Sequence, residues 1–299
     1  MNEESGRLAG KAVVVTGAGR GVGAAIALLA ARQGAAVVVN DLDAEPAEEV
    51  ASQIVADGGL AVAHAADVAD WEQAGGLVQR AVDEFGKLDG LVNNAGVFRV
   101  RPIAEEDETS LRRVLEINVL GTAYPGLHAI RHMVERGSGS IVNVTSGAIA
   151  GIPGMSVYGA SKGAIASLTY GWAIDLRGSG VRVNALSPLA YSRMTETQYD
   201  FEGLDEAARE KARAGMPQPA DNAPVVVYLL SDRSAGVDGQ AVQIRWDASV
   251  ALLTHPAAME GSAAGSATSL RSVEEAFDGP LKATIQPLGI TTVRVEQLS

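Results

Sequence analysis

Tyr158 and Lys162 stand four residues apart in the stretch "SVYGASKG", a spacing that places a phenol and an ammonium on one face of a helix. A phenol has an ordinary pKa of about 10 and is a weak base at neutral pH, but a neighbouring positive charge lowers that pKa. The pair could therefore take the proton of an alcohol while a hydride leaves the adjacent carbon. Because the same spacing is common on solvated helix surfaces, the chain must also supply a cofactor site and a hydroxyl.

The elements that would position this pair alternate between short apolar strands and helices. Strands are expected at 12–17, 35–41, 60–68, 88–96, 139–146, 181–188 and, less regularly, 239–244; helices are expected near 21–34, 44–57, 70–85, 107–135, 156–177 and 220–231. Continuous apolar strands alternating with helices predict a parallel sheet covered on both faces. Right-handed crossovers make this a doubly wound α/β sheet of about seven strands, a Rossmann fold.

A glycine-rich loop joins the first expected strand to the first helix. The sequence "VVVTGAGRGVG" places Gly17, Gly21 and Gly23 at this junction. Glycine allows a tight turn and a close backbone approach to a pyrophosphate, and the free N–H groups of a helix N-terminus favour phosphate there. The strand–loop–helix context therefore predicts a dinucleotide site.

Asp41 ends the second expected strand, where a carboxylate can accept hydrogen bonds from both ribose hydroxyls and repel a 2′-phosphate. Asp41 could instead cap the following turn, as Asp43 could. Arg20 in the glycine loop opposes this preference, because an arginine could pair with a 2′-phosphate. Repulsion inside a pocket outweighs one exposed arginine, so the sequence favours NAD over NADP.

Two further strands end in polar residues. Asp67 and Val68 follow the third strand, where the carboxylate could accept from an adenine amino group or cap the helix at 70–85. The turn "NNAG" at 93–96 follows the fourth strand, and its asparagines can brace neighbouring backbone.

Composition excludes several classes of function. The 299 residues carry a net charge of −12, which argues against nucleic acid and anionic membranes as partners. No cysteine is present, so disulfides and thiolate metal sites are excluded, and we predict no metal. The acidic N-terminus is no signal peptide, and no apolar run approaches the roughly 20 residues of a membrane helix. We expect a cytoplasmic protein.

The motifs together, rather than singly, identify a family. "TGAGRGVG", Asp67-Val68, "NNAG", the asparagine of "LEINVLGT", the serine after "IVNVT" and "YGASK" occur in this order. The set resembles the classical short-chain dehydrogenase/reductase family over residues 8–246. The resemblance implies one Rossmann domain, a nicotinamide cofactor and hydride transfer between an alcohol and a carbonyl. It also implies homotetramers or homodimers packed through the fourth and fifth helices.

The resemblance assigns roles residue by residue. Tyr158 would be the acid/base, Lys162 would hold positive charge near it, Ser146 would donate to the substrate oxygen, and the Asn118 amide would hold water on the lysine. The residues it implies for cofactor binding are Gly17, Arg20, Gly21, Val22, Gly23, Asp41, Asp67, Val68, Asn94, Ala95, Gly96, Tyr158, Lys162, Pro188 and Ser192.

Three features depart from the family pattern. The family serine usually stands one residue farther from the tyrosine than Ser146 does, so Thr145 remains a second candidate donor. Strand pleating lets only one of these two hydroxyls point inward. Pro188-Leu189 replaces a common Pro-Gly, and leucine does not take glycine-only backbone conformations cheaply. The expected domain ends near 247, and the extension at 248–299 is unexplained.

The substrate is less defined than the chemistry. The segment 189–216 reads as a lid or a disordered loop, and the extension at 248–299 could cover the entrance or pack outside. We expect a largely apolar secondary alcohol or ketone, because the candidate rim residues are mostly apolar: Ile149, Ile152, Met155, Leu189, Tyr191 and Met194. Arg99, Arg101 and Arg193 could bind an acid but have surface roles by default. Alternatives are a 3-hydroxyacyl thioester dehydrogenase, an epimerase or dehydratase of the same fold, and a non-catalytic dinucleotide-binding regulator.

Overall fold

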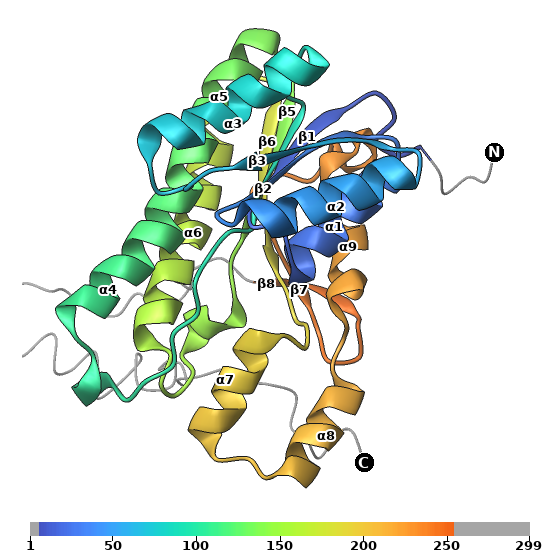
Figure 1. The fold of residues 1–299 in the computed structure, drawn as a ribbon. Coiled ribbons are helices and arrows are strands. Elements are labelled where there is room, and N and C mark those ends of the chain that lie inside the picture. Colours follow the sequence, from blue (N-terminus) through green and yellow to red (C-terminus); the bar gives the residue numbers. More distant parts are fainter. Residues whose placement is uncertain (1–5, 254–299) are drawn as a thin grey trace, which may run out of the picture. The chain divides into compact units, whose positions relative to one another are not determined.

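A computed structural model describes residues 6–253 of the protein. The fold is built around one central sheet (Figure 1). Its strands lie in the order β3-β2-β1-β4-β5-β6-β7-β8. They are β1 (Ala12–Val15), β2 (Ala36–Asp41), β3 (Leu60–Ala65), β4 (Gly90–Asn93), β5 (Gly139–Val144), β6 (Val181–Ser187), β7 (Ala241–Ile244) and β8 (Val250–Leu253). The pairings from β3 to β7 are parallel, and β8 pairs antiparallel with β7. The expected doubly wound α/β fold is confirmed.

Helices cover both faces of this sheet (Figure 1). They are α1 (Gly21–Arg32), α2 (Ala44–Ala56), α3 (Trp71–Phe85), α4 (Glu108–Leu115), α5 (Gly121–Arg136), α6 (Ser156–Asp175), α7 (Arg193–Glu202), α8 (Glu206–Gly215) and α9 (Pro219–Leu230). Short helical turns are η1 (Ile103–Glu105), η2 (Glu116–Leu120), η3 (Gly147–Ala150) and η4 (Asp232–Ser234). Helices α1, α2 and α9 lie on one face, and α3, α5 and α6 lie on the other.

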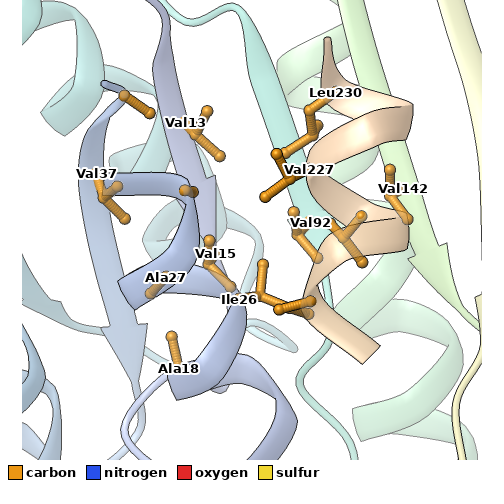
Figure 2. Packing of buried hydrophobic residues seen from close by; sticks show 14 of the residues in the cluster. Val13, Val15, Ala18, Ile26, Ala27, Val37, Val92, Val142, Val227 and Leu230 are labelled. Atoms are coloured by element: carbon orange, nitrogen blue, oxygen red, sulfur yellow. The ribbon is translucent and has the colours of Figure 1, made fainter. Parts of the chain in front are cut away.

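Strand alternation explains the two cores. Val13 and Val15 of β1 point into the cluster with Ile26 of α1 and Val227 of α9, as Figure 2 shows. Val14 points into the opposite cluster. Because both faces of each central strand are buried, these strands read as continuous apolar runs rather than alternating ones.

The sheet extends beyond the expected seven strands. A tight turn at 245–249 returns the chain as β8, so the unit that contains the sheet runs to Leu253 rather than ending near 247. Ala248 in this turn has φ 60°, a left-handed conformation typical of a hairpin with a bulge. The rest of the extension, residues 254–299, lies outside the described residues.

The segment 189–216 is helical rather than an irregular loop. Asp205 caps α8 by accepting from the Ala208 N–H at 2.8 Å, and Gly203 ends α7 with φ 67°. The expected long helix at 107–135 is divided into α4, the π-helical turn η2 and α5. Among the described residues, no helix is long and apolar enough to cross a membrane.

Candidate active site

The carboxyl ends of the parallel strands meet at one edge of the sheet, where each predicted polar motif begins. The chain order reverses between β1 and β4, since β1 is followed outward by β2 on one side and by β4 on the other. Ligands of open α/β sheets bind outside the strand ends at such a switch point. The glycine loop follows β1 and "NNAG" follows β4, so the structure brings the two motifs to this point.

Thr16 and Asn94 brace the glycine loop. The Asn94 amide donates to the carbonyl oxygens of Thr16 and Gly17, both at 2.9 Å. The Thr16 hydroxyl accepts from the N–H groups of Asn94 and Ala95, both at 3.0 Å. Thr16 was missed in the sequence, although it directly precedes the loop. These bonds fix the shape of the loop and do not involve the first backbone N–H groups of α1.

Close approach explains two of the loop glycines. A Cβ at Gly23 would lie 2.3 Å from the Gly17 carbonyl oxygen, and one at Gly17 would lie 2.8 Å from the Ala95 Cα. Neither position therefore accepts a side chain. Arg20 is the N-cap residue of α1 and makes no side-chain cap, so the first N–H groups of α1 are free to bind an anion.

Asp41 faces the glycine loop. Its carboxylate accepts from the Gly19 N–H at 2.9 Å and from the Asp43 N–H at 3.3 Å. Arg20 pairs with Asp43 at 3.4 Å, and both of these side chains are exposed. The structure thus brings Asp41 to the predicted loop, and Arg20 lies beside the carboxylate of Asp43 rather than that of Asp41.

Asp67 and Val68 lie on the β3 side of this edge. The Asp67 carboxylate accepts from the Ala69 N–H at 2.9 Å, so it is not the cap of α3. Asp70 fills that role and accepts from the Gln73 N–H at 2.9 Å. Val68 is buried against Gly121, where a Cβ would lie 2.7 Å from a Val68 methyl carbon. Val22, at the start of α1, packs against the core below the loop.

Tyr158 lies at the start of α6, opposite the end of β5. Burial raises the pKa of Tyr158 to about 12, and a hydrogen bond with Ser146 lowers this pKa in part. The ring of Phe98 packs edge-on against the Tyr158 ring, with centroids 5.0 Å apart. The neighbouring Thr145 hydroxyl is turned away and donates to the Lys162 carbonyl oxygen at 2.9 Å. Phe98 was missed because nothing in the sequence marks it.

Lys162 is buried beneath the phenol. Its Nζ donates to the Val144 carbonyl oxygen at 2.8 Å and lies 5.7 Å from the centroid of the Tyr158 ring. Burial lowers the pKa of Lys162 to about 8. A Cβ at Gly96 would lie 3.6 Å from this Nζ, so the "NNAG" turn approaches the lysine closely. The expected fall of the phenol pKa is therefore not present in the protein alone, where burial dominates.

The side-chain amide of Asn118 is hydrogen-bonded to the backbone of Val97 and is not free. Its Oδ1 accepts from the Val97 N–H at 2.8 Å, and its Nδ2 donates to the Val97 carbonyl oxygen and to the Ser161 hydroxyl, both at 3.0 Å. The amide is therefore occupied, and the expectation that it holds water on Lys162 does not fit these contacts. Asn118 positions the turn after "NNAG" relative to α6.

The connection after β6 carries Pro188 and Ser192. Ser192 begins α7, and its N–H donates to the Thr195 hydroxyl at 3.1 Å. Among the described non-glycine residues only Ala248 has a left-handed φ, so Leu189 takes an ordinary backbone conformation in place of the glycine of the family pattern. The side-chain amide of the buried Asn222 hydrogen-bonds to both the N–H and the carbonyl oxygen of Leu189. The sequence did not indicate this contact.

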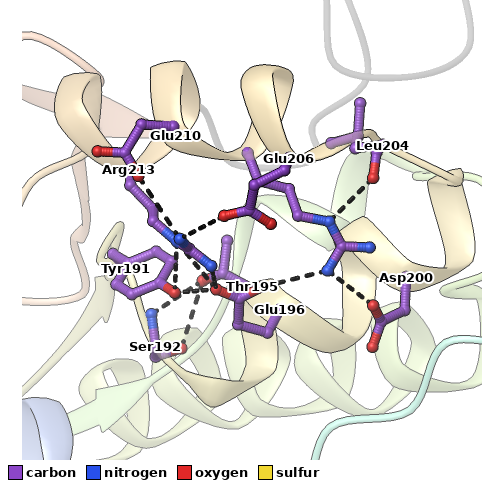
Figure 3. A network of polar contacts seen from close by, with 10 residues as sticks. Tyr191, Ser192, Thr195, Glu196, Asp200, Leu204, Glu206, Glu210 and Arg213 are labelled. Carbon is purple, nitrogen blue, oxygen red and sulfur yellow. Dashed lines mark hydrogen bonds and ion pairs between the residues drawn. The ribbon is translucent and has the colours of Figure 1, made fainter.

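The residues predicted for the rim lie in different surroundings, and Leu189 packs against the core on the α1–α9 face. Ile152 and Met155 pack with Tyr158, Phe98 and Val100, which makes an apolar surface beside the phenol. Ile149 and Met194 are exposed. Tyr191 belongs instead to an ion cluster between α7 and α8 (Figure 3), where its hydroxyl bonds to Glu196 and accepts from Arg213 at 2.9 Å.

The arginines proposed as possible acid binders have other partners where they are described. Arg99 lies 3.7 Å from a Glu106 carboxylate oxygen, and Arg101 pairs with Asp107 at 3.0 Å. Nothing is described of the Arg193 side chain. In residues 6–253 no group of three or more acidic or histidine side chains could hold a metal ion.

The comparisons with known proteins agree with this arrangement. The model of the family described as short chain dehydrogenase matches residues 11–202. The chain therefore belongs to the short-chain dehydrogenase family of oxidoreductases. It is 40% identical over 242 residues to a cis-4-hydroxycyclohexanecarboxylate dehydrogenase of Sinomonas cyclohexanicum, a match that covers 78% of this chain and 94% of that protein.

Solved structures of this family contain either form of the cofactor. An NAD+-bound xylitol dehydrogenase matches with a TM-score of 0.75 and 33% identity, over 79% of this chain and 98% of that one. A gluconate 5-dehydrogenase of Burkholderia cenocepacia in complex with NADP and tartrate matches with a TM-score of 0.72 and 29% identity, over 80% and 94% of the two chains. Similarity alone thus leaves the choice of cofactor to the residues of this chain.

Proposed function

We propose that this protein is an NAD-dependent dehydrogenase of a largely apolar secondary alcohol, or a reductase of the matching ketone, with Tyr158 as the acid/base. The observation that carries the proposal is the meeting of Tyr158, Ser146 and Lys162 at the sheet edge beside the glycine loop.

The residues present fit a nicotinamide dinucleotide. Gly17 and Gly23 leave no room for side chains, and the N-terminus of α1 lacks a side-chain cap. Asp41 stands at the loop where an adenosine ribose would meet it, and its charge disfavours a 2′-phosphate. Arg20 is exposed, and its 3.4 Å pair with the exposed Asp43 contributes little, so Asp41 is the residue that carries the preference. When bound, the nicotinamide supplies the hydride acceptor or donor.

The side chains around Tyr158 divide the proton chemistry. Ser146 donates a hydrogen bond to the substrate oxygen and orients it toward the phenol. Tyr158 takes the hydroxyl proton in oxidation and returns it in reduction. Lys162 provides the nearby positive charge that favours phenolate, and the Val144 carbonyl oxygen fixes its Nζ. Since burial raises the pKa of Tyr158 to about 12, the phenol of the protein alone holds the proton that reduction would use.

The substrate class follows from the surface beside the phenol. Phe98, Met155 and Ile152 form an apolar cluster with Tyr158. The neighbouring Arg101 is paired with Asp107 at 3.0 Å, and the Arg99 guanidinium lies 3.7 Å from a Glu106 carboxylate oxygen. A small apolar ring or chain that bears a secondary hydroxyl fits this environment better than a phosphate or a polyanion.

Assembly and location are part of the proposal. Leu111 and Leu115 of α4 and Leu120 of η2 are exposed, which supports association through the α4–α5 face as a homodimer or homotetramer. A cytoplasmic location is consistent with the negative charge and the absence of cysteine. Size-exclusion chromatography with light scattering tests the assembly, and a monomer at micromolar concentration would contradict it.

The test of the activity follows absorbance at 340 nm with NAD+ or NADP+ and a panel of cyclic and linear secondary alcohols. We expect NAD+ turnover that falls at least about a hundredfold in Tyr158→Phe. Tyr170→Phe, on the same helix, is the matched control and keeps turnover. Tight NADH binding with no turnover of any alcohol, ketone or 3-hydroxyacyl thioester would instead favour a dinucleotide-binding regulator.

A further inference from the structure

Asn222, in the first turn of α9, pairs with both backbone groups of one distant residue. Its Oδ1 accepts from the Leu189 N–H at 3.1 Å, and its Nδ2 donates to the Leu189 carbonyl oxygen at 3.0 Å. The same Nδ2 also donates to the Gln218 carbonyl oxygen at 3.2 Å. The side chain is fully buried. A buried amide in this geometry acts as a substitute for a neighbouring strand.

Leu189 needs such a partner because of its place in the chain. The last paired residue of β6 is Ser187, opposite Gln243 of β7, so Leu189 has left the ladder. Pro188 has no N–H and cannot extend the ladder itself. Backbone groups that are removed from water without a partner cost about 1–3 kcal/mol each. By bonding both backbone groups of Leu189, Asn222 avoids this desolvation cost in one conformation of the segment after β6.

This connection lies beside the proposed reaction centre. Val144 of β5 is opposite Leu186 of β6, and the Thr145 N–H donates to the Leu186 carbonyl oxygen at 2.8 Å. Extending this register by two residues places Pro188 opposite Ser146. The Asp41 end of the candidate site lies across β1 and β2, several strands away. A shift of Pro188-Leu189 would therefore affect the nicotinamide end of the site and leave the adenosine end intact.

We infer that Asn222 is a positioning residue that sets the Pro188-Leu189 turn for binding of the nicotinamide half of the cofactor. The inference rests on the proposed function. It explains how leucine occupies a turn where the family pattern has glycine: the turn takes an ordinary φ, and an external side chain fixes it.

The experiment compares two ligands that share the adenosine end. Dissociation constants of NADH and of ADP-ribose, which lacks nicotinamide, are measured for the wild type and for Asn222→Leu. Without its two bonds to Asn222, at about 1 kcal/mol each, the turn occupies other conformations, and only the competent fraction binds nicotinamide. NADH binding should therefore weaken by roughly 10- to 30-fold. ADP-ribose binding stays within about twofold, because its contacts lie elsewhere.

Asn184 offers a matched control. It is also a fully buried asparagine whose amide bonds the backbone at two points, Val237 and Gln240, both at 2.9 Å. These contacts lie on the connection that enters β7. Asn184→Leu is expected to lower the denaturation temperature while leaving the ratio of NADH to ADP-ribose affinity unchanged. Asn222→Ser, a milder variant, keeps the test open if Asn222→Leu does not fold, and should weaken NADH several-fold.

The outcomes separate the inference from the proposed function. If Asn222→Leu, or Asn222→Ser where the former does not fold, changes both affinities equally or changes neither, Asn222 has no positioning role toward nicotinamide. If the wild type binds neither ligand, the proposed function itself fails. A selective loss of NADH affinity in Asn222 variants, absent from Asn184→Leu, supports the inference.

Discussion

Thr145 and Ser146 are adjacent at the end of β5, yet their hydroxyls serve different neighbours. The Thr145 hydroxyl donates to the Lys162 carbonyl oxygen at 2.9 Å and is buried, whereas the Ser146 Oγ accepts from the Ala148 N–H at 3.2 Å and lowers the pKa of the Tyr158 phenol. The two residues point to opposite sides because successive side chains of an extended strand alternate. The Thr145 hydroxyl is therefore used by the backbone of α6, which is why we propose Ser146 as the donor to a substrate.

Removal of each hydroxyl in turn should separate the donor to the substrate from a purely structural hydroxyl. We expect Ser146→Ala to reduce kcat about a hundredfold, because it removes the proposed donor beside the phenol. It should also lose about 1 kcal/mol of unfolding free energy, since the Ser146 Oγ accepts from the Ala148 N–H at 3.2 Å and caps η3. Thr145→Val should keep most of kcat and lose about 1 kcal/mol of stability, since a buried carbonyl loses its donor. Steady-state kinetics and urea unfolding of both variants measure this. The reverse pattern would assign the donor role to Thr145.

Burial of the charged Lys162 amine should lower the free energy of unfolding. Its pKa of about 8 lies below the ordinary 10.5, because burial disfavours the charged amine. Below pH 8 both the folded and unfolded states hold the proton, so the full penalty is present. Between about pH 8 and 10.5 the unfolded state binds the proton more, so stability rises with pH.

The variant Lys162→Met tests this penalty. At pH 7 it should be more stable than the wild type by on the order of 2 kcal/mol, while turnover is lost. The stability difference should shrink at pH 9, where the amine of the folded wild type is largely neutral. Urea unfolding at the two pH values measures it. A stability difference that grows with pH would mean that burial does not disfavour the charged form of the Lys162 amine.

Asp41 should set the preference for NAD+ over NADP+. Asp41→Ser removes the charge beside the glycine loop, so we expect the ratio of kcat/KM values to move toward NADP+ by roughly tenfold or more. Asp43→Ser releases Arg20 but leaves Asp41 in place, so it should move the ratio less. Initial rates with both cofactors measure the two shifts. An equal or larger effect of Asp43→Ser would show that Arg20, rather than Asp41, controls the preference.

Glu196 should hold α8 to α7. In the described chain α8 buries no residue, so ion pairs rather than apolar contacts attach it. The Glu196 carboxylate accepts from Arg213 at 2.7 Å and from Arg209 at 3.4 Å, and it also bonds to Tyr191 (Figure 3). We expect Glu196→Gln to raise KM several-fold with kcat little changed, and to speed proteolysis within 203–215.

The matched control for this cluster is Glu108→Gln, which breaks the exposed Arg112–Glu108 pair of α4. It should leave KM and proteolysis unchanged, because isolated surface pairs contribute about 0–1 kcal/mol. High salt should reproduce part of the Glu196→Gln effect in the wild type by screening the cluster. Equal KM values for the two variants would show that the cluster does not position the segment 189–216.

The sequence alone determined the framework of this protein. Apolar runs such as 12–17 and 139–146 separated by helical patterns predicted the doubly wound sheet, because strand and helix periodicities are local properties of the chain. The family motifs were also readable, since each lies within a few residues at the end of one strand or the start of one helix. The family was recognised for this reason, and the roles of Tyr158, Lys162 and Ser146 remain predictions that the experiments above test.

Only the tertiary structure decided the contacts between distant segments. The pairing of Asn222 with Leu189 and the attachment of α8 through Glu196 join residues that no local pattern relates. The orientation of Ser146 against Thr145 depends on the side of β5 that α6 covers, and the burial of Tyr158 itself raises the phenol pKa against the expected direction. Burial and long-range hydrogen bonding depend on how the elements pack, and that packing is a property of the whole chain rather than of any short stretch.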